Sequence, residues 1–299
     1  MSVSEVRDQL MAAVALSGHV QTLPEKRLKA IVTEWWPAQI VKPVLANRNP
    51  VPRRELYALF EILHVVRDNL QLDLREKIPG YFKDMPVYYV MGHYPAPFPS
   101  NAGFFRIPAE KGLEQPEQRA AELSRLAGLA IVAYDGTAQE AQFAQGWLID
   151  DRFLLQTSFG APYEFLWANP YLPGLPFDRL PLMFYQPSYE ELFVRSNWND
   201  DGEWLGYFGG EVQIMKEGNF STRRLERGDK PLIIGESILT MGKVPYRLEM
   251  PAQDVERLFL LDMPKKKRLD VEFDDQELLE VETDDRGILD LKLIPGHPV

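Results

Sequence analysis

The stretch from Glu191 to Met215 reads ELFVRSNWNDDGEWLGYFGGEVQIM, and it marks a change in the hydrophobic pattern of the chain. Apolar and polar residues alternate here with a period of two, which is typical of strands that bury one face. The pair Gly209-Gly210 separates two such segments and supplies the backbone freedom that a hairpin turn requires. Similar short segments continue to the C-terminus, at residues 231–241, 245–250, 257–263, 268–273, 277–283 and 288–294. We therefore predict an antiparallel β-sandwich over residues 188–299.

The first 150 residues carry a helical pattern instead, in which apolar residues recur every three or four positions. Ser2 and Glu5 have the spacing of a capping box. The same spacing in Thr22 and Glu25 predicts a second helix, which ends at Pro37. The periodicity predicts further helices at residues 54–70, 116–136 and 137–147. We predict a domain of helical hairpins over residues 1–150, and an α+β fold for the chain.

Two proline-rich segments interrupt these patterns. The segment from Pro79 to Pro108 predicts a long loop, because prolines recur along it. The segment YEFLWANPYLPGLPFDRLP, residues 163–181, lies in a junction that we place at residues 151–187. Its rings and amide groups suit either a carbohydrate-binding surface or a wedge between a helical layer and a sheet.

The composition argues against several classes of partner. A net charge of −11 and a pI near 5.0 predict no nucleic-acid partner, because a phosphate-binding surface needs an excess of Lys and Arg. The basic run Lys265–Arg268 is interpreted as a charged turn between two strands, with a localisation signal or an anion-binding patch as alternatives. The chain has no cysteine and no glycine-rich phosphate loop, and its four histidines lack ligand spacing. We therefore predict no cofactor and no metal site.

The N-terminal residues lack a cationic leader, and no apolar run approaches ~18 residues, the length of a membrane span. These two features predict a cytoplasmic protein without a membrane partner.

Two arginines stand out by their positions. Arg67 falls within the apolar arc of the helix at 54–70, so it either meets a carboxylate, binds an anion, or reaches past the end of the helix to solvent. His64 lies at the edge of the same arc and is interpreted as a histidine at the rim of the core. Arg195 shares a strand face with an aromatic residue and an amide, where it either neutralises a substrate carboxylate or forms a surface salt bridge.

The order of these parts resembles that of the heparinase II/III-like polysaccharide lyases. The resemblance is carried by FVRSNWNDDGEWLGYFGG at residues 193–210, and by VETDDRGILDLKLIPG at residues 281–296. It implies a shortened, distant relative in which part of an α/α toroid packs on an antiparallel β-sandwich. It also implies β-elimination beside the carboxylate of a uronic acid.

In that family a Tyr or His removes the C5 proton, while Asn, Arg or His neutralises the carboxylate. The resemblance therefore suggests candidate catalytic residues, namely Tyr163, His93 and Arg195. The candidate substrate-binding residues are Asn101, Trp167, Asn169, Tyr171 and Trp198. If the prediction is right, His93, Asn101, Tyr163 and Arg195 converge in one cleft.

Two functions follow from these observations. The first is a carbohydrate-active protein, either an acidic-polysaccharide lyase or a non-catalytic glycan-binding relative, with an acidic oligosaccharide as its partner. The alternative is a cytoplasmic non-enzymatic accessory or assembly protein. In that case, exposed strand edges of the β-sandwich bind a partner protein or a second copy of the chain.

Overall fold

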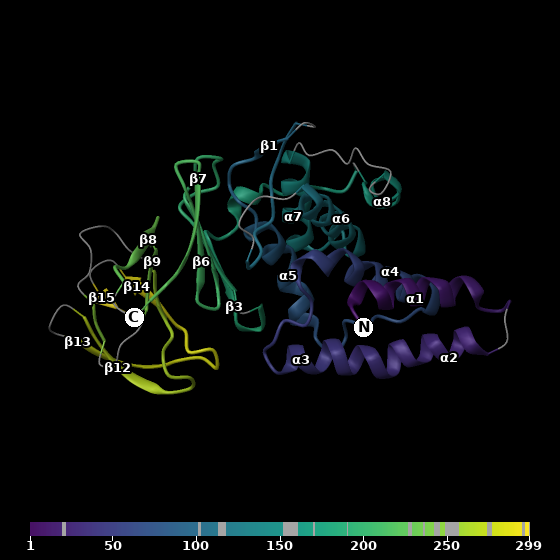
Figure 1. Cartoon of the computed structure of the whole chain (residues 1–299), viewed down its shortest axis with the longest axis horizontal. Coiled ribbons are helices and arrows are strands. Elements are labelled where there is room, and N and C mark those ends of the chain that lie inside the picture. Colours follow the sequence, from purple (N-terminus) through teal and green to yellow (C-terminus); the bar gives the residue numbers. More distant parts are fainter. Residues whose placement is uncertain are drawn as a thin grey trace. The chain divides into compact units, whose positions relative to one another are not determined.

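The computed structural model divides into a helical unit, residues 1–181, and a β unit, residues 182–299. Figure 1 shows the helices of the first unit and the sheets of the second. The structure describes residues 1–19, 22–100, 103–112, 118–151, 161–169, 171–189, 191–226, 229–235, 237–241, 246–248, 257–273, 277–294 and 297–298. The α+β fold is thereby confirmed. The dividing line after Pro181 assigns the described part of the aromatic segment 163–181 to the helical unit.

The helical unit contains helices of very different length. They are α1 (Val3–Leu16), α2 (Leu23–Ala30), α3 (Lys42–Leu45), α4 (Leu56–Leu70), α5 (Pro79–Met91), α6 (Gln118–Tyr134), α7 (Gln139–Asp150) and α8 (Ala161–Trp167). A short ribbon of two strands, β1 (Phe98–Ser100) and β2 (Gly103–Phe105), completes the unit.

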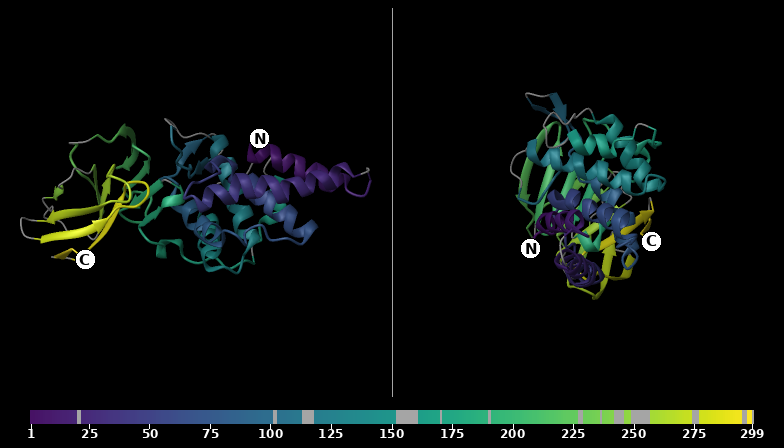
Figure 2. Two further views of the ribbon diagram at one scale, coloured as in Figure 1. Left: turned by 90° about the horizontal axis from the view of Figure 1, so that it is seen from below. Right: turned by 90° about the vertical axis from the view of Figure 1, so that its right-hand side faces the viewer.

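The first helix begins as the sequence predicts. The Ser2 hydroxyl accepts a hydrogen bond from the Glu5 amide at 3.2 Å, and the Glu5 carboxylate accepts one from the Ser2 amide at 2.8 Å. The capping box is therefore confirmed. Helix α1 packs against both α2 and α4, and the views of Figure 2 show α1 and α2 side by side. Between α1 and α4, the Arg7 guanidinium forms an ion pair with the buried Glu61 carboxylate.

The prediction that the second helix ends at Pro37 is wrong. Helical backbone continues through two π-helical turns, Ile31–Trp35 and Pro37–Val41, into α3. A π turn closes its hydrogen bond over five residues, as from the Trp36 amide to the Ile31 carbonyl, and such bulges accommodate a proline that lacks an amide hydrogen. Burial of Trp36, whose indole donates to the Leu74 carbonyl at 3.0 Å, stabilises this region. The capping box predicted for Thr22 is also absent, because this residue has a left-handed backbone and makes no side-chain cap.

The prediction of a loop from Pro79 to Pro108 is wrong for its first half, which forms α5. Pro79 occupies the first turn, where the missing amide hydrogen has no helical partner to lose. Pro86 lies inside the helix, where it removes one backbone hydrogen bond. The helix is nevertheless stabilised by a set of buried side chains that offset this loss: Tyr81, Phe82, Met85, Tyr88, Tyr89, Val90 and Met91.

In its described residues, the β unit contains two five-stranded sheets and a smaller sheet. The first sheet is antiparallel, in the order β3 (Met183–Gln186), β4 (Glu191–Arg195), β5 (Trp204–Phe208), β6 (Glu211–Lys216), β7 (Asn219–Arg224). The second has the order β15 (His297–Pro298), β14 (Leu289–Ile294), β11 (Arg257–Leu261), β9 (Ser237–Met241), β8 (Leu232–Ile234). The third has the order β10 (Tyr246–Leu248), β12 (Arg268–Phe273), β13 (Glu277–Glu282).

The two large sheets share one hydrophobic core. Leu192 and Val194 of β4 and Leu205 of β5 pack with Leu239 of β9 and Phe259 of β11. Strand alternation explains this arrangement, because residues two apart lie on the same face of a strand. The first sheet is antiparallel, as predicted, but two strand pairs elsewhere in the unit, β9 with β11 and β10 with β12, are parallel. Residues 242–256 separate β9 from β11, and a parallel pair requires a connection of about that length.

Of the basic run Lys265–Arg268, the three lysines lie in the turn between β11 and β12, as predicted, and all four side chains are exposed. Arg268, the first residue of β12, pairs with Glu280 at 3.4 Å. Among the residues that the structure describes, no helix is long and apolar enough to cross a membrane.

Candidate functional site

A groove of about 290 Å³ opens on the helical unit between α4, α5, α6 and α7. Its floor is apolar and is formed by Phe60, Pro79, Phe82, Pro86, Ile131 and Ala141. Its rim is charged and is formed by Asp73, Arg75, Glu76, Lys83, Asp135 and Glu140. Tyr134, the last residue of α6, lies where floor and rim meet.

Two residues of the floor, Phe60 and Phe82, belong to a cluster of aromatic rings. The Phe60 ring meets the rings of Phe82 and Tyr134 edge to face, with centroids 6.1 and 6.2 Å apart. On its other side, Phe82 stacks with Trp36 at 6.3 Å. These contacts fix α5 against α4 and α6, and they leave Phe60 and Phe82 buried beneath the groove.

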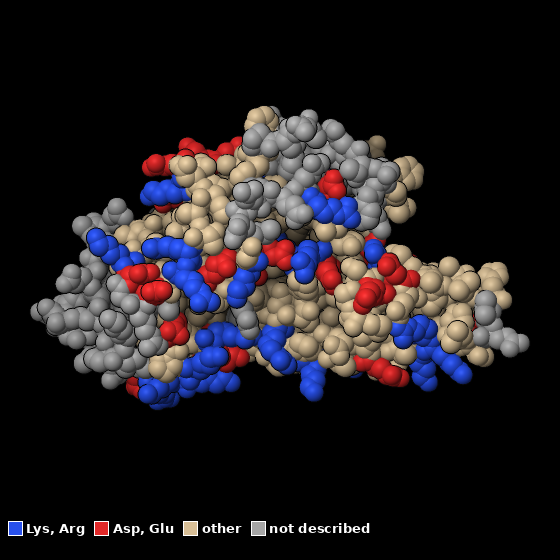
Figure 3. Space-filling model, in the orientation of Figure 1, with Lys and Arg blue, Asp and Glu red and all other residues tan. Residues whose placement is uncertain are grey.

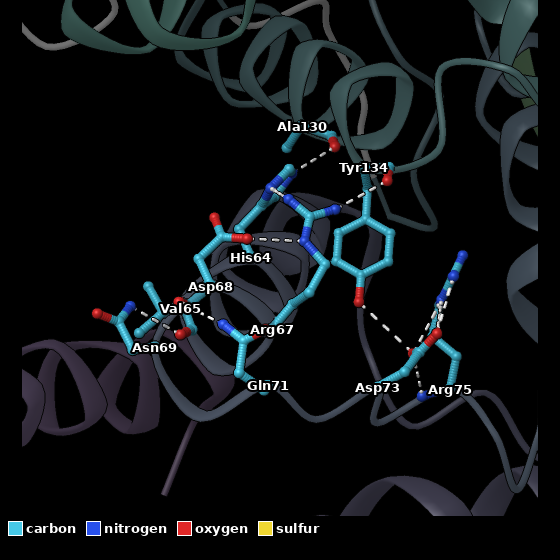
Figure 4. Close-up of polar contacts among 10 residues, drawn as sticks. All are labelled: His64, Val65, Arg67, Asp68, Asn69, Gln71, Asp73, Arg75, Ala130 and Tyr134. Carbon is cyan, nitrogen blue, oxygen red and sulfur yellow. Dashed lines mark hydrogen bonds and ion pairs between the residues drawn. The ribbon is translucent and has the colours of Figure 1, made fainter.

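Two arginines surround the Tyr134 ring (Figure 4). The guanidinium carbons of Arg67 and Arg75 each lie 4.4 Å from the ring centroid, which is the geometry of a cation–π contact. The Tyr134 hydroxyl donates to the Asp73 carboxylate at 3.5 Å. Burial, together with the negative charge of Asp73, raises the pKa of Tyr134 to about 12. The phenol is therefore protonated at neutral pH.

Most charges on the rim are already paired. Arg75 binds Asp73 at 3.0 Å and Asp135 at 3.5 Å, while Lys83 lies 3.8 Å from Glu140. Hydrogen bonds from Arg75 hold the pKa of Asp73 below its usual value. Glu76 forms no ion pair with any residue that the structure describes. The rim therefore has four carboxylates against two cations, and Glu76 is its unpaired acid.

His64, on α4, lies beside the Tyr134 ring, with the two ring centroids 5.0 Å apart (Figure 4). Its Nε2 lies 2.9 Å from the Ala130 carbonyl and its Nδ1 lies 3.1 Å from an Arg67 nitrogen. Because the carbonyl only accepts and the guanidinium only donates, the ring is the neutral tautomer with its hydrogen on Nε2. Burial and the nearby Arg67 charge both lower the pKa of His64. The interpretation of His64 as a residue at the edge of the core agrees with this geometry. Arg67 is not an unpaired cation, because its guanidinium forms an ion pair with the Asp68 carboxylate at 2.8 Å. Of the predicted alternatives, the contact with a carboxylate is the one that the structure shows.

His93 contacts a serine hydroxyl, as a catalytic base can, but it is buried and has almost no contact with solvent through which a substrate could reach it. Its Nε2 lies 2.9 Å from the Ser124 hydroxyl and its Nδ1 lies 2.8 Å from the Tyr89 carbonyl. An Arg53 nitrogen also lies 3.3 Å from Nδ1, and the contact between Nε2 and the hydroxyl is that of a serine–histidine pair. The ring is only 1% exposed, and Arg53 covers it by binding the carbonyls of Tyr88 and Tyr89. This pair joins the segment that follows α5 to α6, and its buried histidine is closed to a substrate in this structure.

The other predicted site residues lie in different surroundings. In the helical unit, Trp167 stacks on His64 with centroids 5.2 Å apart, and the Asn169 side chain accepts from the Tyr171 amide at 3.0 Å. Tyr171 is 93% exposed. In the β unit, Arg195 is buried, and its guanidinium carbon lies 4.6 Å from the Trp198 ring.

Asn101 lies outside the described residues, as does the side chain of Tyr163. The structure brings Arg195 together with Trp198, and Asn169 with Tyr171. The predicted convergence of His93, Asn101, Tyr163 and Arg195 stays a prediction.

The groove residues were missed by sequence reasoning. The charged residues of the segment Asp73–Lys77, between two helices, were the sequence feature that could have indicated the rim. The prolines of α5 led to the prediction of a loop in place of the helix that completes the groove. Within the described residues, no group of three or more His, Asp or Glu side chains has the arrangement of a metal site. Figure 3 shows acidic and basic side chains interspersed on one face of the molecule, with no continuous basic field there.

Comparison with known protein families, with curated proteins and with solved structures finds no match to this chain. The description of the protein therefore rests on its own structure. It is an α+β protein whose helical unit has a groove with an apolar floor and a charged rim.

Proposed function

We propose that this protein is a non-enzymatic binding protein and that the groove of the helical unit is its ligand site. The observation that carries this proposal is a groove of about 290 Å³ that is lined by apolar residues and has charged residues at its rim. Ligand sites typically combine such a floor with a few polar groups that orient the ligand.

The groups nearest the groove are suited to binding rather than to proton transfer. Tyr134 keeps its proton because its pKa is about 12, and Asp73 is held as a carboxylate by Arg75. A general acid or base works best when its pKa lies near the working pH. These two groups therefore favour recognition of a ligand over chemistry on it.

The size of the groove limits what enters it. About 290 Å³ is at the lower end of the roughly 300–1,000 Å³ that small-molecule sites occupy. We infer that the groove receives one part of a larger ligand, such as a side chain or a single ring.

The acidic-oligosaccharide prediction stays open as a second proposal, since the aromatic residues Trp167 and Tyr171 suit sugar rings. The groove does not favour it, because the rim repels a uronic acid and the Phe60 and Phe82 rings are buried. Incubation with acidic oligosaccharides tests the lyase directly. An unsaturated product absorbing in the ultraviolet would establish the lyase and overturn the non-enzymatic proposal.

The binding proposal is tested with protein carrying ¹³C-labelled Ile and Ala methyl groups. Peptides, sugars and small amines are added one class at a time, and the methyl resonances of Ile131 and Ala141 on the floor are followed. We expect at least one class to shift these resonances in wild type. The same class should fail with Ala138→Phe, which fills the groove from its edge.

The matched control is Ala12→Phe, the same change on the exposed surface of α1, which should bind as wild type does. If no class shifts the floor methyls, or if Ala138→Phe binds as well as wild type, the groove is not the ligand site.

A further inference from the structure

We infer that the occupant of the groove is a basic segment of a partner protein, with a Lys or Arg side chain on the floor and its cation at Glu76. This inference rests on the proposed function above and adds the chemical class of the ligand.

The charges of the rim select a cationic ligand. Arg75 is engaged by Asp73 and Asp135, and Lys83 lies beside Glu140, so both rim cations are already neutralised. Glu76 remains without an ion pair among the described residues, and its side chain is exposed at the groove. An incoming cation gains a new ion pair there without displacing an existing one. The net charge of −11 also attracts a basic segment toward the protein.

The floor suits the stem of such a side chain. Lys and Arg bury their methylene groups against apolar surface while the charged end stays in water. Pro79 and Pro86 of α5 and Ile131 of α6 supply apolar surface next to the acidic rim. When the methylene groups of a Lys or Arg side chain lie on these residues, its charged end is next to the carboxylates of the rim.

The rim favours a chain over a single small ion. Its acids come from separate segments of the chain, with Glu76 before α5, Asp135 directly after α6 and Glu140 in the first turn of α7. A peptide with several basic residues meets more than one of these acids at once, which raises its affinity through effective concentration. Acidic ligands meet repulsion from the same groups.

The test uses the full chain and the capped synthetic peptide GSKLRLKSG, with the acidic peptide GSELELESG and spermine for comparison. Calorimetry measures affinity, and the floor methyls of Ile131 and Ala141 report the place of binding. We expect the basic peptide to bind in the groove, more weakly as salt rises, and the acidic peptide not to bind.

Glu76→Gln should weaken binding of the basic peptide about two- to fivefold, the range of a partly exposed ion pair. Glu76→Lys should weaken it further, because the charge is reversed. Asp178→Asn removes the same charge from an exposed position outside the groove lining, and it should leave the affinity unchanged.

Several results would overturn the inference. They are equal binding of the two peptides, equal effects of Glu76→Gln and Asp178→Asn, or tighter groove binding by spermine than by the peptide. A neutral sugar that shifts the floor methyls while the basic peptide does not would also overturn it, yet the groove would remain the ligand site. If no probe shifts these methyls, the proposed function itself fails.

Discussion

Protonation of His64 provides a sensitive test of the contacts between α4 and α6. The neutral ring donates from Nε2 to Ala130 and accepts at Nδ1 from Arg67. A second proton would place an N–H opposite the Arg67 N–H, and one cation beside another. Around the ring, Arg67 and Asp68 come from α4, Tyr134 from α6, and the uncharged Trp167 from α8. The folded protein therefore disfavours the charged histidine.

The sign of the pH effect follows from this lowered pKa. The unfolded chain takes up the proton near pH 6.5, whereas folded His64 takes it up only at a lower pH. Between these two values the unfolded state binds more protons, so the free energy of unfolding falls as the pH falls. The slope approaches about 1.4 kcal/mol per pH unit for one group, and it vanishes above pH 6.5.

The change that removes this effect is His64→Gln, because glutamine has a donor and an acceptor but no titration. Urea unfolding of wild type and variant is followed at pH 7.5 and 5.5, and the difference between the two proteins is compared. We expect wild type to lose about 1 kcal/mol relative to the variant at the lower pH. The histidine C–H resonances report the pKa directly. A His64 pKa of 6.5 or above, or the same stability difference at both pH values, would refute the reasoning.

Two further predictions concern stability. Glu61→Gln leaves Arg7 without its buried partner and should lower the free energy of unfolding in urea by about 3 kcal/mol. The double variant Arg7→Leu, Glu61→Leu should recover most of this loss. A Glu61→Gln variant as stable as wild type would contradict the prediction. Gly146→Ala should lower stability by about 1–3 kcal/mol, because its Cβ would overlap the Leu175 carbonyl, while Gly80→Ala, with no atom within 4 Å, should be neutral or stabilising by thermal unfolding. Equal melting temperatures for the two alanine variants would show that the contact at Gly146 relaxes freely.

The sequence predicts the strands well because their signals are local. Short apolar segments after Glu191, with paired glycines at 209 and 210, are enough to place β4, β5 and β6, although β5 is buried on both faces and not on one. The Ser2 capping box is equally local. The pairing of strands is not a local property and could not be predicted in the same way. The parallel pair of β9 and β11, for example, joins strands that are not consecutive in the sequence.

The prolines show why local signals fail. Pro37 and Pro86 each remove a helical hydrogen bond, and both were read as breaks. Burial of neighbouring rings, such as Trp36 and Tyr89, stabilises the helices in spite of that loss. The groove could not be predicted either, because it forms only where the helix α5, which the prolines obscure in the sequence, packs against α4, α6 and α7. Glu76 becomes distinctive only when the partners of the surrounding charges are known.

The most direct measurement for the central claim is a crystal structure of the full chain with the peptide GSKLRLKSG. The account predicts a Lys or Arg side chain of the peptide along Pro79, Pro86 and Ile131, with its nitrogen within about 4 Å of the Glu76 carboxylate. A peptide bound elsewhere, with the groove empty, would contradict it.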